Sequence, residues 1–165
     1  MTKDELRTQL KQMPTGWYEA FGEPFLDELW NALVEYDCTD KFFIEQVKEK
    51  WGWLRIYFND DLPEIIYSIH DKYELISAHT CIRCGRPDVG RLQVGKILPM
   101  CKKCFDKECD GTYSLVVPTG IMEVRIPDYY IRTWRKGHKE IDVTYNISTT
   151  VNKVRENWRR NHPND

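Results

Sequence analysis

The sequence predicts an α+β protein in which helices pack on short antiparallel hairpins around a four-cysteine module in the middle of the chain. Apolar residues recur at helical spacing on both sides of residues 42–58, where the period changes to two. Two Cys-x-x-Cys pairs then follow, separated by sixteen residues. These patterns divide the chain into a helical and hairpin region (1–78), a four-cysteine zinc module (79–110) and an α+β C-terminal extension (111–165).

The composition is that of an ordinary globular protein. The 165 residues are 41% hydrophobic and 30% charged, and the length suits one domain with an elaboration. No run approaches the roughly 18 apolar residues of a membrane span, and the first residues are polar. We therefore expect a cytoplasmic protein without membrane contact. In that reducing compartment the six cysteines are better explained as metal ligands and buried thiols than as disulfides.

The net charge of −2 conceals two halves of opposite sign. Residues 1–80 carry 16 acidic and 8 basic side chains, a net charge of −8, whereas residues 81–165 carry 10 and 16, a net charge of +6. Such an asymmetry can steer a charged partner. It can equally reflect attraction between the halves or differently solvated faces.

Two helices are predicted before the first hairpin. Thr2 and Glu5 form a capping-box pattern that predicts a short helix over 3–11. A second helix is predicted from Glu23-Pro24 to about Tyr36. Its buried stripe consists of Leu26, Leu29, Trp30, Leu33 and Val34.

The period-two segment predicts a hairpin whose turn contains Gly52. Leu54, Ile56 and Phe58 share one face of its second strand. The opposite face carries Trp53, Arg55 and Tyr57. An arginine between two aromatic rings can stack on a nucleobase or contact a protein partner, but the same triplet also forms ordinary cross-strand pairs. A helix opened by Pro63 should pack on this hairpin.

The cysteine module is predicted to hold one structural zinc ion through Cys81, Cys84, Cys101 and Cys104. Four thiolates close the coordination sphere and leave no position where a water or substrate is activated. Residues 91–99 predict a short hairpin, and the second pair falls on a second knuckle or on the first turn of a helix. The module is thus a zinc ribbon or a treble clef. Cys38 and Cys109 are left over. Cys109, five positions after Cys104, could compete as a ligand, although an uncoordinated buried thiol is the simpler interpretation.

Several of these motifs occur together in a known family. The blocks QVKEKWGWLRIYF, CIRCGRP and LPMCKKC, preceded by Gly16-Trp17, resemble small, largely uncharacterised phage and prophage proteins with a "VKEKFG-LR-Y" hairpin and a paired CxxC module. The resemblance covers about residues 16–107, with Trp51 where the family usually has phenylalanine. The resemblance implies a phage origin and bound zinc, but it supplies no mechanism. From the phage context alone, we expect binding to host components, including defence systems. The resemblance extends to nothing in residues 111–165.

The C-terminal extension is predicted to contain a hairpin, two helices and a strand. The hairpin pairs 113–117 with 121–126, a short helix covers 127–134, and a strand covers 141–147. Ser148 caps a last helix. That helix should bury Val151, Val154 and Trp158 and expose Lys153, Arg155, Arg159 and Arg160.

A basic cluster in this extension is the candidate phosphate-contacting surface. Its members are Arg132, Arg135, Lys136, Lys139, Arg159 and Arg160, interleaved with Tyr129, Tyr130, Trp134 and Trp158. A solvated helix face would carry the same residues.

These features favour a binding module over an enzyme. Our preferred hypothesis is a zinc-stabilised, phage-derived accessory protein that binds and modulates a host protein. The alternative is a nucleic-acid-binding protein that uses the basic, aromatic-rich last third. An HNH-like nuclease is a third hypothesis, but it needs a histidine between the cysteine pairs, and residues 85–100 contain none.

Overall fold

The computed structural model describes residues 1–94, 96–108 and 124–164. Its helices are α1 (Lys3–Leu10), α2 (Thr15–Trp17), the π-helical turn η1 (Tyr18–Gly22), α3 (Glu23–Glu35), α4 (Glu64–Ser77), α5 (Lys102–Glu108) and α6 (Ser148–Asn161). Its strands are β1 (Ile44–Lys50), β2 (Trp53–Phe58), β3 (Arg91–Val94), β4 (Lys96–Pro99), β5 (Tyr129–Lys136) and β6 (Lys139–Asn146). Consecutive strands pair into three antiparallel two-stranded hairpins, which confirms the α+β class.

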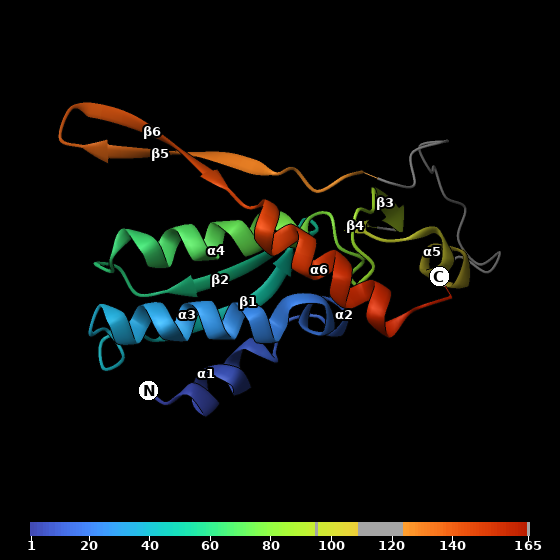
Figure 1. Cartoon of the computed structure of the whole chain (residues 1–165), viewed down its shortest axis with the longest axis horizontal. Coiled ribbons are helices and arrows are strands. Elements are labelled where there is room, and N and C mark those ends of the chain that lie inside the picture. Colours follow the sequence, from blue (N-terminus) through green and yellow to red (C-terminus); the bar gives the residue numbers. More distant parts are fainter. Residues whose placement is uncertain (95, 109–123, 165) are drawn as a thin grey trace.

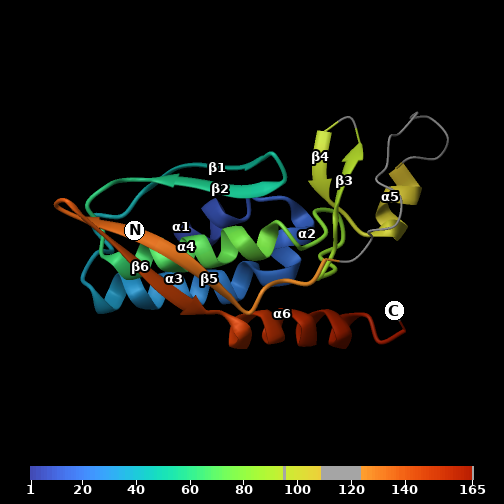
Figure 2. The ribbon, with the colours of Figure 1, turned by 90° about the horizontal axis from the view of Figure 1, so that it is seen from above.

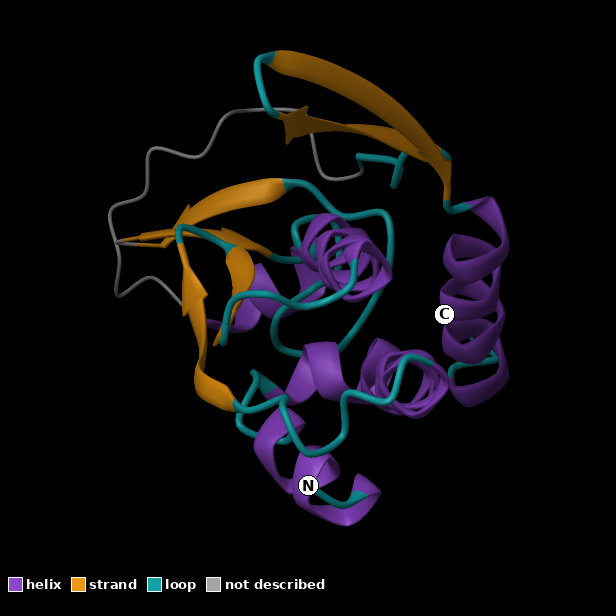
Figure 3. Ribbon diagram, turned by 90° about the vertical axis from the view of Figure 1, so that its left-hand side faces the viewer, coloured by secondary structure: helices purple, strands orange, loops and turns teal. Residues whose placement is uncertain are grey.

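The helices α3 and α4 form the centre of the molecule (Figures 1 and 2). The β1–β2 hairpin covers one side of this pair, and α6 lies on the opposite side (Figures 2 and 3). The β5–β6 hairpin, which we call the arm, extends over α4 as a separate ribbon (Figures 1 and 3). The elements β3, β4 and α5 gather at one end (Figure 2).

The first helix forms as predicted, but the second begins earlier. Thr2 and Glu5 make both hydrogen bonds of the capping box at the start of α1. The chain then turns helically from Thr15 and passes through a π-helical turn before α3. Pro24, in the first turn of α3, has no amide hydrogen, and its ring would clash with the carbonyl of the preceding turn. The wider π turn relieves that clash.

The predicted β1–β2 hairpin and its packing on α4 are confirmed. Trp51 and Gly52 form the two-residue turn, both with positive φ (55° and 81°), as tight hairpin turns require. Leu54 and Ile56 are buried against α4, and the Leu54 amide donates to the Ser77 hydroxyl at 2.9 Å.

One continuous core joins the helices to the cysteine module. Phe25 stacks on Tyr73, with ring centroids 4.5 Å apart, and the buried residues continue through Trp17 into β3 and β4. One predicted member of the core is wrong. Val34 is 55% exposed because it lies on the side of α3 that faces away from α4 and the hairpin.

The short helix predicted over 127–134 is wrong, because this segment is strand β5. Its aromatic and β-branched residues alternate between two faces, and Gly137 (φ 62°) lets the chain turn directly into β6. The strand predicted over 141–147 is confirmed as β6. The first predicted strand, 113–117, lies outside the described residues, and residues 124–126 at the end of its predicted partner form no strand.

The last helix also departs from the expectation at two residues. Ser148 is the first residue of α6, and the N-cap position is Ile147, which makes no side-chain cap hydrogen bond; just before it, Asn146 Oδ1 accepts hydrogen bonds from both the amide and the hydroxyl of Ser148. Arg155, expected to face water, is 6% exposed. Val151 and Val154 are buried as predicted, and Trp158 is half-buried.

Candidate metal centre and contact surfaces

The four predicted ligands converge on one point. The sulfur atoms of Cys81, Cys84, Cys101 and Cys104 all lie within 4.8 Å of one another. The Cys84 and Cys101 sulfurs are 3.7 Å apart, close to the roughly 3.8 Å separation that a tetrahedral ion with metal–sulfur bonds of about 2.3 Å imposes. A disulfide bond would require about 2.05 Å. The four thiols therefore fit a tetrahedral metal ion.

The backbone around the sulfurs has the order of a treble clef. Cys81 and Cys84 form a knuckle closed by the Gly85 amide, which donates to the Cys81 carbonyl at 2.9 Å. The β3–β4 hairpin follows; Cys101 immediately precedes α5, and Cys104 lies in the first turn of that helix. A zinc ribbon would place the second pair on another knuckle, so the helix favours the treble-clef arrangement.

Without a cation, four clustered thiols cannot all ionise. Hydrogen bonds from Cys101 and Cys84 lower the pKa of Cys81, whereas burial and the neighbouring Cys81 raise the pKa of Cys104 to about 12. A divalent ion removes this conflict, because its charge favours the thiolate form of every ligand. Metal binding at this site is therefore coupled to the loss of protons.

Gly16 and Trp17 attach the cysteine module to the helices. The Trp17 indole is fully buried and donates to the Thr80 carbonyl at 2.9 Å. The Gly16 amide donates to the Ile82 carbonyl at 3.2 Å. A Cβ on Gly16 would lie 2.5 Å from that same oxygen. This contact explains the Gly-Trp pair that precedes the helix in the sequence.

Replacing Gly16 with alanine is expected to destabilise the protein by about 3 kcal/mol, because the knuckle backbone has to move. Urea unfolding measures this loss. Gly137→Ala is the matched control, since nothing lies within 4 Å of its added Cβ, and it should cost only about 1 kcal/mol for the left-handed backbone. Equal losses for the two variants would contradict the proposed contact.

An ion pair that the sequence did not predict joins α6 to the same module. The Arg155 guanidinium donates to both Asp88 carboxylate oxygens, at 2.8 and 2.9 Å. Asp88 Oδ1 also accepts from the Ile126 amide at 2.8 Å. Asp88 follows the first knuckle with a φ of 59°, so its turn directs the carboxylate toward α6. The one sequence feature that could have pointed to this ion pair is that Asp88 is the single carboxylate between the two cysteine pairs.

The candidate surface on β2 is used within the protein. Arg55 forms an ion pair with Glu74 on α4. Trp53 has Arg55 and Arg91 over its ring, 5.9 and 5.2 Å from the centroid. Tyr57 is partly exposed beside Lys48. This face thus links β2 to α4 and to the β3–β4 hairpin, which favours the structural interpretation of the triplet.

The arm's inner face packs on α4 through long polar and aromatic side chains. Tyr130 donates to the Ser68 carbonyl at 2.6 Å. Arg132 pairs with Asp71 and stacks on Trp134 with its guanidinium carbon 4.0 Å from the ring centroid. These contacts use two of the sequence-predicted binding residues, Arg132 and Trp134, to hold the arm in place.

A histidine-centred network lies beneath the arm. The ligand atoms of His70, Asp71 and Glu74 lie within 4.8 Å of one another. Burial and the charges of Arg132 and Arg55 lower the pKa of His70 to about 4, so it is neutral near pH 7. The same arginines pair with the two carboxylates, leaving no excess negative charge for a cation. We therefore regard this network as the arm's docking site.

The predicted basic cluster is divided in space. Arg135, Lys136 and Lys139 lie at the arm's tip, whereas Arg159 and Arg160 lie in the last turn of α6, at the opposite end of the molecule (Figures 1 and 2). The structure thus does not bring the six basic residues into one surface.

The other candidate residues have structural roles or lie outside the described chain. The buried Cys38 thiol donates to the Tyr36 carbonyl at 3.2 Å, and Cys109 is not described. Two histidines outside the cysteine module, which a nuclease would have to use, lie on different elements: His162 stacks on Trp158 of α6, and His138 lies in the turn between β5 and β6. No helix among the described residues combines the length and apolar character needed to cross a membrane.

Comparisons with known proteins add no relative. The chain matches no protein-family model, no curated protein and no solved structure.

Proposed function

We propose that this protein is a zinc-stabilised binding module that attaches to a host protein through its arm and has no catalytic role. Zinc is the metal that suits four thiolates in tetrahedral geometry, and such a closed site stabilises a fold without activating a substrate. In this protein the site braces the junction that Gly16, Trp17 and Arg155 make with the cysteine module. The resemblance to phage proteins makes a host component the expected partner.

The outer face of the arm is the observation that carries this proposal. Since Tyr130, Arg132 and Trp134 face α4, the alternate residues of β5 point away from the protein. Tyr129 and Ile131 on that outer face are each 60% exposed. Large apolar side chains on a projecting two-stranded ribbon are typical of a protein contact surface.

The nucleic-acid alternative has weaker electrostatic support. Arg132 and Arg155 are held in ion pairs with Asp71 and Asp88, and Arg135 pairs with Glu140 at 3.3 Å. Binding along a phosphate backbone depends on several cations that act together. At the arm's tip, Lys136 and Lys139 are the cations that form no ion pair within the described chain.

Capture from host lysate tests the arm. The tagged protein should retain a stoichiometric partner, and the double substitution Tyr129→Ser/Ile131→Ser should lower its recovery at least tenfold, because large apolar anchors supply most of an interface's binding energy. Phe43→Ser is the matched control, since Phe43 is also half-exposed but lies before β1.

Two outcomes would contradict the proposal. Equal recovery with the double variant would place the contact elsewhere. Saturable binding of labelled single-stranded DNA or RNA at low salt, measured by fluorescence anisotropy and lost on Lys136→Met, would instead support the nucleic-acid alternative.

A further inference from the structure

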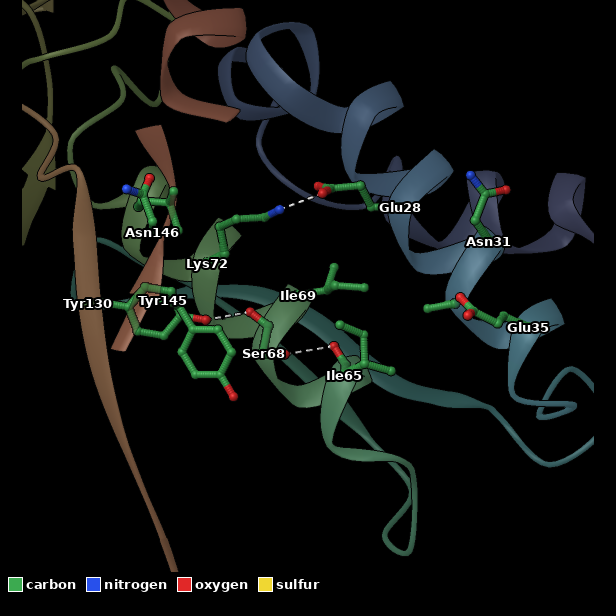
Figure 4. Close-up of a pocket in the computed structure, with 12 residues that line it drawn as sticks. Glu28, Asn31, Glu35, Ile65, Ser68, Ile69, Lys72, Tyr130, Tyr145 and Asn146 are labelled. Carbon is green, nitrogen blue, oxygen red and sulfur yellow. Dashed lines mark hydrogen bonds and ion pairs between the residues drawn. The ribbon is translucent and has the colours of Figure 1, made fainter. Parts of the chain in front are cut away.

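A cleft of about 350 Å³ lies between α3, α4 and the base of the arm (Figure 4). Glu28, Asn31 and Glu35 line it from α3, and Ile65, Ser68, Ile69 and Lys72 line it from α4. Tyr130, Tyr145 and Asn146 close the end nearest the arm (Figure 4). Its volume suits one long side chain or a small ligand.

The two glutamates of the cleft differ in how they are paired. Glu28 is held by Lys72 and by the Tyr73 hydroxyl, one on each carboxylate oxygen. Glu35, two helical turns further along the same face of α3, has no ion pair or side-chain hydrogen bond within the described chain. With one lysine against two glutamates, the residues that line the cleft carry a net charge of −1.

The remaining lining suits the stem of a basic side chain. Ile65 and Ile69 form an apolar floor (Figure 4). Tyr130 and Tyr145 stack with ring centroids 5.1 Å apart at one end. Lysine and arginine bury their methylene groups along apolar surface and place the charge near a carboxylate or an aromatic face.

We propose that this cleft receives a lysine or arginine side chain of the protein partner. The inference rests on the proposed function and names the chemistry of its anchor. Ile65, which lines the cleft together with Glu35, is 37% exposed, so accessible apolar surface adjoins the charged position. An anchor ringed by apolar contacts is typical of protein interfaces, and the net charge of −8 on residues 1–80 favours a basic partner.

The cleft can be tested without the partner by NMR titration of the full-length, zinc-loaded protein with N-acetyl-arginine methylamide. Amide shifts should concentrate at Glu35, Ile65 and Tyr145. Glu35→Gln should raise the Kd about fivefold by removing the unpaired charge. Lys72→Met should lower the Kd about fivefold, because it frees the charge of Glu28. Since structural damage does not strengthen binding, that gain is diagnostic.

Two controls complete the titration. Glu156→Gln removes an exposed charge from α6 and should leave the Kd unchanged. N-acetyl-norleucine methylamide has a similar stem without the charge and should cause no saturable shifts. Saturation that is unaffected by Glu35→Gln, or shifts outside the cleft, would overturn the inference.

The capture experiment separates the two proposals. A partner whose recovery depends on Tyr129 and Ile131 but not on Glu35 would overturn the cleft and leave the proposed function intact. Arginine binding in the cleft without any captured partner would support the cleft as a cation site and count against the proposed function.

Discussion

Replacing Cys84 or Cys101 with serine is expected to unfold the cysteine module. Structural zinc sites contribute on the order of 10 kcal/mol of binding free energy at pH 7, and this energy is available only to the folded state. Because the core is continuous from the module into the helices, we expect the loss to spread to the contacts of Trp17 and Thr80. Circular dichroism should show a loss of secondary structure, and the measured zinc content should fall from one ion per chain to none.

Cys38→Ser is the matched control for this experiment. Cys38 is a buried thiol outside the metal centre, so its substitution should retain the zinc ion and cost only about 1–2 kcal/mol. A wild-type protein that stays fully folded after complete removal of metal by a chelator would contradict the role of zinc.

Replacing Arg155 with methionine is expected to lower the free energy of unfolding by about 3 kcal/mol. The substitution keeps an unbranched apolar stem but removes the guanidinium. The Asp88 carboxylate is then left without its buried partner, which is the costly way to break such a pair. Urea unfolding measures the loss. Arg159→Met, on the exposed side of the same helix, should change stability by less than about 0.5 kcal/mol.

The pH dependence of this loss of stability shows whether the ionised Asp88 carboxylate is responsible for it. Burial by itself would raise the pKa of Asp88, but the hydrogen bonds from Arg155 and the Ile126 amide, with the guanidinium charge, bring that pKa below its usual range. A carboxyl whose pKa is lowered on folding stabilises the folded state above its unfolded-state pKa of about 3.9, and this contribution disappears as the pH falls through the folded-state pKa.

The stability difference between wild type and Arg155→Met should therefore be constant near neutral pH and shrink below about pH 4. Asp88→Asn should reproduce most of the loss at pH 7. A difference that persisted unchanged at pH 2 would mean that Arg155 acts through packing alone.

The convergence of Cys81, Cys84, Cys101 and Cys104 is the feature that the sequence predicts best. Cys-x-x-Cys spacing places two ligands within one tight turn. The fold therefore only has to bring the two turns together for the four sulfurs to converge. The spacing does not distinguish which element carries the second pair, because a knuckle and a helical first turn accept the same spacing. The surrounding hairpin and helix α5 settle it in favour of the treble-clef arrangement.

The candidate binding surfaces were predicted less well. Pro127 and Gly137, at the two ends of this segment, suit a helix as well as a strand. The β-forming residues between them adopt strand β5 because they pair with β6. That pairing directed Arg132 and Trp134 inward and Tyr129 and Ile131 outward. The predicted basic cluster includes both Arg159 and residues of the arm, but in the structure they lie at opposite ends of the molecule (Figures 1 and 2).

The sequence by itself determined the local elements: the capping box at Thr2, the turn at Trp51-Gly52, the helix from Pro63 and the paired cysteines. Each depends on residues close together in the chain, where backbone geometry and side-chain chemistry act directly. The tertiary structure alone decided which charges are buried. Arg155 has the local pattern of a solvated residue, and only its meeting with Asp88, 67 positions away, makes burial favourable. Long-range pairing likewise produced the cleft between α3, α4 and the arm, because its lining residues come from three separate stretches of the chain.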